Sequence, residues 1–112
     1  VIVEGDAAVA EALRLVFESR GMRAVVFGSA EAALADPDIR LADCYVCDFG
    51  LPGMSGADFL ETLQQASTRP VRAVMVSGDT SESLRECSRA GGWPLLTKPI
   101  NFAEVMSALE LR

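Results

Sequence analysis

The sequence predicts a doubly wound α/β fold, in which helices cover both faces of one parallel five-stranded sheet. Short apolar runs alternate with longer amphipathic segments along the whole chain. The apolar runs show little alternation of polar and apolar residues, which is typical of strands buried on both faces. The chain has 112 residues, 50% of them hydrophobic, the size and composition of an ordinary soluble domain. We therefore expect one domain over residues 1–112.

The first half of the chain contains three of the expected strands and two helices. The strands are the apolar runs at 1–3, 24–27 and 44–47. Between the first two, apolar residues recur at the spacing of a helix with one buried face, at Val9, Ala12, Leu13, Val16 and Phe17. Gly21 ends that helix. Ser29 is placed to cap a short Ala-rich helix, which Pro37 and its flanking aspartates end.

The second half continues the alternation. A loop over 50–56 is indicated by its glycines and proline, and Phe59, Leu60 and Leu63 mark the helix after it. The remaining elements are a strand at 71–76, a helix at 81–90, a strand at 93–97 and a final helix with Phe102, Val105, Met106 and Leu109 on its core face. Pro94 favours an edge position for the fifth strand. Asn101 and Glu104 match a capping box for the last helix.

Composition excludes several classes of function. A net charge of −6 argues against direct binding of nucleic acid. The absence of histidine excludes His-based catalysis and most zinc sites within the chain. Three cysteines are too few for a disulfide framework, and no apolar run is long enough to span a membrane, so we expect a cytoplasmic protein. The chain begins inside an apolar run without Met, so we expect a piece of a longer protein.

Polar side chains follow four of the expected strands, at the edge where open parallel sheets bind ligands. Glu4 and Asp6 follow the first strand, Asp48 the third, Ser77 the fourth and Lys98 the fifth. Carboxylates are hard oxygen ligands for Mg²⁺, and lysine and serine bind phosphoryl oxygens. A carboxylate can also be the nucleophile of aspartyl-phosphate chemistry. We expect this set to hold a divalent cation and a phosphoryl group around Asp48.

These residues resemble the response-regulator receiver domain of two-component signalling, over essentially the whole chain. The resemblance rests on the acids after the first strand, on Asp48 followed by Leu51-Pro52-Gly53-Met54-Ser55-Gly56, and on Val76-Ser77-Gly78, Ala90-Gly91 and Lys98-Pro99. It implies a flavodoxin-like sheet with strand order 2-1-3-4-5, and a signalling domain rather than an enzyme. It implies a histidine kinase or histidine phosphotransfer domain as partner. An effector domain in the same chain, or a homodimer, would provide the output.

The resemblance also implies a role for each site residue. Asp48 is expected to be the phosphoacceptor, and Ser77 and Lys98 are expected to bind the phosphoryl group. Gly50 and Asp79 occupy the variable positions that tune dephosphorylation in this family. Phosphorylation would then switch a protein-interaction surface.

The implied metal site departs from the family pattern. The family has two adjacent acids after the first strand, whereas here Gly5 stands at the second position and Asp6 follows one residue late. Mg²⁺ would be held by Glu4, Asp6, Asp48 and the backbone carbonyl of Gly50. We expect this site to be weakened, with partial rescue if a positive φ at Gly5 turns Asp6 toward Asp48.

Three alternatives stay open. Leu95 stands where the family has an aromatic switch residue, and together with Gly5 it favours a pseudo-receiver that works as an interaction or dimerisation module. A phosphohydrolase with an Asp nucleophile needs an acid two residues further on, where this chain has Gly50. Cys44 and Cys47 form a C-x-x-C, but in a strand they point to opposite faces, so two buried thiols are the better interpretation.

Overall fold

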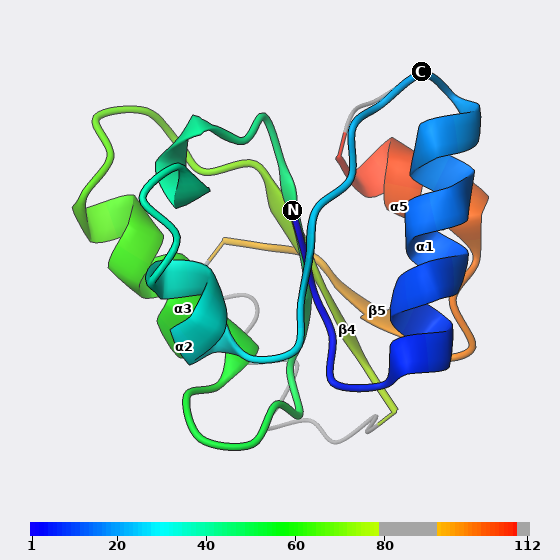
Figure 1. Ribbon diagram of the computed structural model, residues 1–112, viewed down its shortest axis with the longest axis horizontal. Helices are drawn as coiled ribbons and strands as arrows, with labels where there is room; N and C mark the ends of the chain where they lie inside the picture. The colour runs from blue at the N-terminus through cyan, green and yellow to red at the C-terminus, as the bar shows by residue number, and fades with distance from the viewer. Residues whose placement is uncertain (79–91, 110–112) are drawn as a thin grey trace.

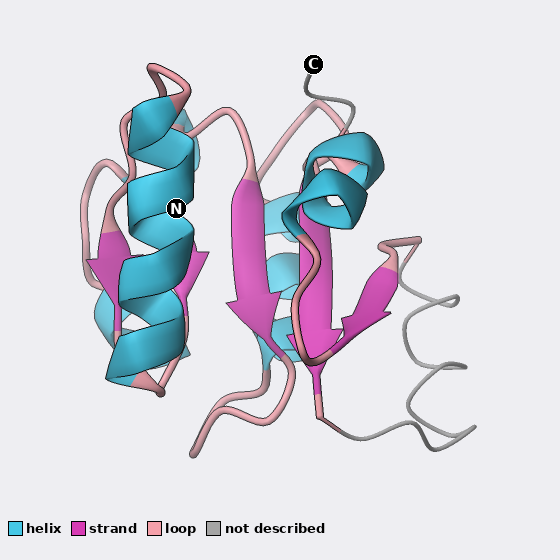
Figure 2. Ribbon diagram, turned by 90° about the vertical axis from the view of Figure 1, so that its right-hand side faces the viewer, coloured by secondary structure: helices cyan, strands magenta, loops and turns pink. Residues whose placement is uncertain are grey.

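The computed structural model describes residues 1–78 and 92–109, and it confirms the predicted α/β fold. Its sheet is parallel, with the predicted strand order β2-β1-β3-β4-β5. The strands are β1 (Ile2–Val3), β2 (Val26–Phe27), β3 (Tyr45–Asp48), β4 (Ala73–Ser77) and β5 (Leu95–Thr97). The strand arrows in Figure 2 all run toward the same end of the molecule. The polar residues that follow the strands are therefore gathered at one edge, as the sequence predicted.

Helices cover both faces of this sheet. They are α1 (Ala7–Ser19), α2 (Ala30–Leu34), α3 (Gly56–Gln65) and α5 (Phe102–Ala108), with a short 3₁₀ helix η1 (Ile39–Leu41). Figure 1 shows α1 and α5 on one face and α2 and α3 on the other. The helix predicted at 81–90 lies outside the described residues. No helix in the described ranges is long and apolar enough to cross a membrane.

Each face of the sheet has its own hydrophobic core. Phe59, Leu60 and Met75 belong to the core under α2 and α3, and Leu13 and Val105 to the core under α1 and α5. Burying such side chains stabilises a fold by about 1.5–3 kcal/mol each. The strands can therefore be short, because both faces of their few residues are covered.

The two cysteines of β3 and its approach separate onto these two cores, as the strand periodicity predicted. Cys47 packs under α2 and α3, and Cys44 packs under α1 and α5. Both are free thiols, and burial raises the pKa of each. A raised pKa disfavours the thiolate that redox chemistry requires. This confirms that Cys44 and Cys47 are buried thiols.

The helix starts are fixed by side-chain caps. Ser29 accepts from the Ala32 N–H, as predicted, and Asn101 accepts from the N–H groups of Ala103 and Glu104, which is the Asn101 half of the predicted capping box. Ser55 caps α3 in the same way, a role that the sequence analysis did not assign. β5 begins only at Leu95, because proline at the preceding position has no N–H for the ladder. β5 is an edge strand, as Pro94 predicted.

Gly56, the first residue of α3, packs directly against the strand that carries Asp48. A Cβ added at Gly56 would lie 2.6 Å from the backbone carbonyl oxygen of Asp48, whereas a Cβ at Gly28 would meet nothing within 4 Å. The absence of a side chain at Gly56 therefore sets how closely α3 approaches β3.

Gly56→Ala is expected to destabilise the chain by about 1–3 kcal/mol, since a backbone carbonyl cannot move aside as a flexible side chain can. Helix propensity alone predicts the opposite sign, a gain of about 0.5–1 kcal/mol. Urea unfolding of Gly56→Ala, with Gly28→Ala as the control, measures the difference. A Gly56→Ala variant as stable as the control would show that this contact is not limiting.

Candidate functional site

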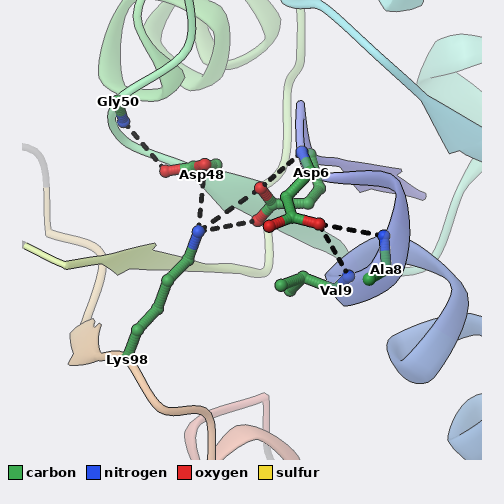
Figure 3. Close-up of polar contacts among 7 residues, drawn as sticks. Asp6, Ala8, Val9, Asp48, Gly50 and Lys98 are labelled. Carbon is green, nitrogen blue, oxygen red and sulfur yellow. Dashed lines mark hydrogen bonds and ion pairs between the residues drawn. The ribbon is translucent and has the colours of Figure 1, made fainter.

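Lys98 lies between two carboxylates at the carboxyl edge of the sheet. Its Nζ is 3.2 Å from Asp48 Oδ2 and 3.3 Å from Glu4 Oε1 (Figure 3). Glu4 follows β1, Asp48 ends β3 and Lys98 follows β5, so the lysine side chain reaches past the end of β4 to its partners. The predicted convergence of Glu4, Asp48 and Lys98 is thus present as direct ion pairs.

Asp48 is held by one donor on each carboxylate oxygen. Oδ2 accepts from Lys98, and Oδ1 accepts from the Gly50 backbone N–H at 2.9 Å. Burial alone raises the pKa of Asp48, but neighbouring Glu4, the Gly50 N–H and Lys98 outweigh it and hold the pKa below its usual value. Its side chain is still 14% exposed. Asp48 is therefore an ionised carboxylate that a reactant can approach.

Glu4 is the buried member of the group, with a side chain only 1% exposed. Its Oε1 accepts from the Asp6 backbone N–H at 3.1 Å and from Lys98, whereas its Oε2 is buried without a hydrogen-bond donor. Burial, followed by the adjacent Asp48 carboxylate, raises the pKa of Glu4. Burial of Lys98 lowers its own pKa, but the Asp48 and Glu4 carboxylates outweigh this effect and raise the pKa of Lys98. The site thus contains two acids with different proton affinities.

The Asp6 side chain is committed to α1. Its Oδ1 accepts from the backbone N–H groups of Ala8 and Val9, at 2.9 and 3.3 Å (Figure 3). Gly5 is not among the glycines with positive φ, so the turn that would re-aim Asp6 toward Asp48 is not adopted. Within the described residues, no three Asp, Glu, Cys or His side chains form a potential metal site. Asp6 acts as a helix cap, and its role as a metal ligand stays a prediction.

Two further predicted site residues, Ser77 and Leu95, lie in β4 and β5. Ser77 is buried at the end of β4, where its backbone carbonyl accepts from the Lys98 N–H at 2.8 Å. The residue before it, Val76, pairs with Asp48 across the sheet. Leu95 is half-buried in β5, where it pairs with Met75. Asp79 lies outside the described residues.

One residue near the site was not identified from the sequence. The Glu31 carboxylate on α2 accepts from the Met54 backbone N–H at 3.3 Å and lies against Gly53, whose φ is +75°. A Cβ at Gly53 would overlap that carboxylate. Glu31 thus fixes the loop that follows Asp48. The only sequence signal was the loop glycine, which does not reveal its partner 22 residues away.

The family model of the response regulator receiver domain matches residues 1–110 of the chain. The chain belongs to the response regulator receiver domain family. This receiver domain is 33% identical over 110 residues to the sensory transduction protein RegX3 of Mycobacterium tuberculosis, covering 97% of this chain and 48% of that protein. It is 30% identical over 109 residues to nodulation protein W of Bradyrhizobium diazoefficiens, covering 96% and 48%. The chain therefore spans about half the length of these relatives.

Solved structures give the same fold. The receiver domain superposes on a CheY-like response regulator receiver domain protein from Methanospirillum hungatei with a TM-score of 0.82 at 25% identity, covering 97% of this chain and 87% of that one. This likeness supports the fold and family, and it agrees with the predicted class of signalling domain.

The raised pKa of Glu4 has a consequence for the metal-free receiver domain. A carboxyl whose pKa is higher folded than unfolded favours the fold when protonated, so its contribution to stability falls as pH rises through the folded pKa. We expect Glu4→Gln to remove that fall and to raise the melting temperature at pH 7.

Thermal unfolding between pH 4 and pH 8 in EDTA checks this expectation, with Glu61→Gln on the exposed side of α3 as the control. Asp48 has a lowered pKa, so its stabilising contribution is lost only as pH falls below its ordinary pKa. This loss does not mask the effect of Glu4. Identical pH profiles for Glu4→Gln and the unmodified chain would show that burial of the ionised Glu4 carboxylate does not destabilise the fold.

Proposed function

We propose that this receiver domain accepts a phosphoryl group on Asp48 from a phosphohistidine of a partner protein, a histidine kinase or histidine phosphotransfer domain. A carboxylate oxygen of Asp48 forms the new bond to phosphorus, the P–N bond of phosphohistidine breaks, and the imidazole nitrogen keeps the electron pair. The observation that carries the proposal is the Lys98 ammonium, held 3.2 Å from an ionised and accessible Asp48.

The residues around Asp48 provide orientation and charge. The Gly50 N–H fixes Oδ1, so the carboxylate is held in one orientation before the donor arrives. Lys98 is a cation that can follow the developing negative charge from Asp48 to a phosphoryl oxygen, a task suited to its flexible stem. Ser77 follows Val76, the β4 residue that pairs with Asp48, and is proposed as the hydroxyl ligand of the phosphoryl group. Positioning and charge stabilisation account for most catalysis of phosphoryl transfer.

The donor set fits Mg²⁺. Two carboxylates and a backbone carbonyl suffice for an ion that normally keeps several waters and binds substrate phosphates. Glu4 and Asp48 would provide the carboxylates, and Glu4 Oε2, which lies 3.3 Å from the Lys98 Nζ but accepts no hydrogen bond, is the proposed ligand atom. Gly50 is proposed to provide the carbonyl. Mg²⁺ bound there would offset the negative charge that the acids and the phosphoryl group bring together.

A switch of an interaction surface is proposed to start at β4 and β5. The Lys98 backbone N–H donates a hydrogen bond to the Ser77 carbonyl. A shift of either residue toward a phosphoryl group would therefore act on the ends of both β4 and β5. Leu95 has neither ring nor hydroxyl, so its response is limited to packing. An effector domain or a second copy of the chain would be the recipient.

The second candidate is a pseudo-receiver, which keeps the fold but is not productively phosphorylated. Two observations favour it. The Asp6 carboxylate accepts hydrogen bonds from the first N–H groups of α1, and Gly5 has no side chain that could bind a metal ion. Such a domain would act as a constitutive interaction module. Phosphorylation in the presence of Mg²⁺ separates the two candidates.

Incubation with acetyl phosphate and Mg²⁺ is expected to add one phosphoryl group, detected by mass spectrometry and released by hydroxylamine. Asp48→Asn should abolish the adduct because a neutral amide replaces the nucleophilic carboxylate. Asp6→Asn removes one neighbouring charge but preserves the cap, since Asn and Asp are similarly good caps, and it should still be labelled. An adduct that persists in Asp48→Asn would place the acceptor elsewhere, and no adduct at any Mg²⁺ concentration would favour the pseudo-receiver.

Gly5→Asp is expected to tighten Mg²⁺ binding roughly tenfold, equivalent to about 1.4 kcal/mol, and to speed phosphorylation. The substitution has room, since a Cβ at Gly5 would meet only the Gly28 carbonyl at 3.9 Å. Asp6→Asn should weaken binding much less, because its carboxylate is engaged by α1. Isothermal titration with Mg²⁺ compares the variants. Unchanged affinity in Gly5→Asp combined with loss in Asp6→Asn would identify Asp6 as the full substitute.

A further inference from the structure

At the end of the sheet opposite Asp48, three arginines line one hollow of about 600 Å³. They come from two segments: Arg40 from η1, and Arg69 and Arg72 from the loop between α3 and β4. All three are exposed. Asp43 is the only acid in the lining. The hollow therefore carries an excess of positive charge inside a receiver domain whose net charge is −6.

None of these arginines forms an ion pair with another residue of the described ranges. The ion pairs there join Arg14 to Glu11 and Glu18, and Lys98 to Glu4 and Asp48. Lys98 is thus paired with the acids of the site described above, and Arg14 of α1 is paired with acids of its own helix. Arg40, Arg69 and Arg72 instead have guanidinium donors free to bind an added anion.

A neighbouring hollow of about 580 Å³ provides an internal comparison. It also includes Asp43, but it is lined by one arginine, Arg23, with two further acids, Asp36 and Asp38. Its charge is therefore negative, although it lies at the same end of the sheet. The positive charge is a property of the hollow around Arg40, Arg69 and Arg72 and not of this whole surface.

The floor of the hollow is apolar and fixed. Leu63, Tyr45 and Val71 line it, and the Tyr45 hydroxyl is occupied by its hydrogen bond to the Ile39 carbonyl at 2.6 Å. A volume of this size is that of a small-molecule site, in which apolar walls hold the body of a ligand and a few polar groups orient it. A bare phosphate would occupy only a small part of it.

We propose that this hollow binds a small phosphorylated organic molecule of the nucleoside diphosphate class. Guanidinium groups bind phosphate oxygens through paired N–H donors, and the apolar floor contacts the organic part. The site is separate from the acceptor, because β4 lies between Arg72 at one end and Ser77 at the other. Binding here therefore does not depend on phosphorylation of Asp48.

The test is titration of the chain with ADP, and separately with inorganic pyrophosphate, in EDTA at physiological salt. Calorimetry should give one saturable site for ADP with a dissociation constant at or below roughly millimolar. Pyrophosphate should bind the same residues more weakly, because it makes no contact with the apolar floor. Amide NMR shifts should centre on Tyr45, Val71 and Arg72, with none at Asp48 or Gly50.

Substitutions should change the affinity in opposite directions. Arg40→Gln and Arg72→Gln should each weaken ADP binding about tenfold or more, the usual effect of removing a charge-assisted hydrogen bond. Asp43→Asn should strengthen it, because the one repelling acid is removed. Arg14→Gln, which removes the same charge from α1, should leave it within about twofold.

Three results would overturn the proposal. ADP could fail to saturate any site at millimolar concentration. The shifts could centre on Asp48, which would assign the anion to the acceptor site. Arg14→Gln could weaken binding as much as Arg72→Gln, which would reduce the effect to net charge. Each variant carries a surface substitution, and its melting temperature verifies that it is folded.

Discussion

The carboxyl edge of this receiver domain depends on one ammonium group shared by two carboxylates. A carboxylate as buried as Glu4 is costly to ionise, and the adjacent Lys98 ammonium offsets only part of that cost, since the pKa of Glu4 stays raised. The same ammonium, together with Glu4 and the Gly50 N–H, holds the pKa of Asp48 below its usual value, so one cation acts on both acids. It also ties the short edge strand β5 to β1 and β3, from which it is otherwise separated by β4. Structure and reactivity are thus coupled at this point, because any group that draws Lys98 toward itself releases both acids.

The start of α1 competes with the site for its acidic residues. The first N–H groups of a helix need acceptors, and Asp6 satisfies two of them. An acid one residue earlier, at Gly5, would fall outside this cap and remain available to a cation. A shift of one position therefore changes what a carboxylate does, even though the chemistry of the side chain is the same. The two acids that follow β1 thus have different environments, Asp6 as a helix cap and Glu4 as a buried carboxylate.

The sequence was sufficient for what periodicity and strand polarity determine. Parallel strands end at the same edge, so the convergence of Asp48 and Lys98 followed from their order, and the separation of Cys44 from Cys47 followed from strand geometry. Backbone angles and loop contacts were not accessible in this way. The direction of Asp6 depends on φ at Gly5, for which a glycine gives no preference. The contact of Glu31 with the loop after Asp48, and the grouping of three arginines from irregular segments, depend on tertiary packing for which no local pattern exists.

The alternation of strands and helices also gives the two ends of the sheet opposite polarity. Each helix that follows a strand begins near the carboxyl edge and ends near the other, so positive helix ends gather around Asp48 and negative ends gather at the opposite edge. Anionic chemistry at Asp48 is thereby favoured by the fold itself. At the opposite edge the negative helix ends disfavour an anion. An anion site at that edge therefore requires more cationic side chains than one at Asp48 does. The single lysine at Asp48 and the three arginines of the hollow are consistent with that difference.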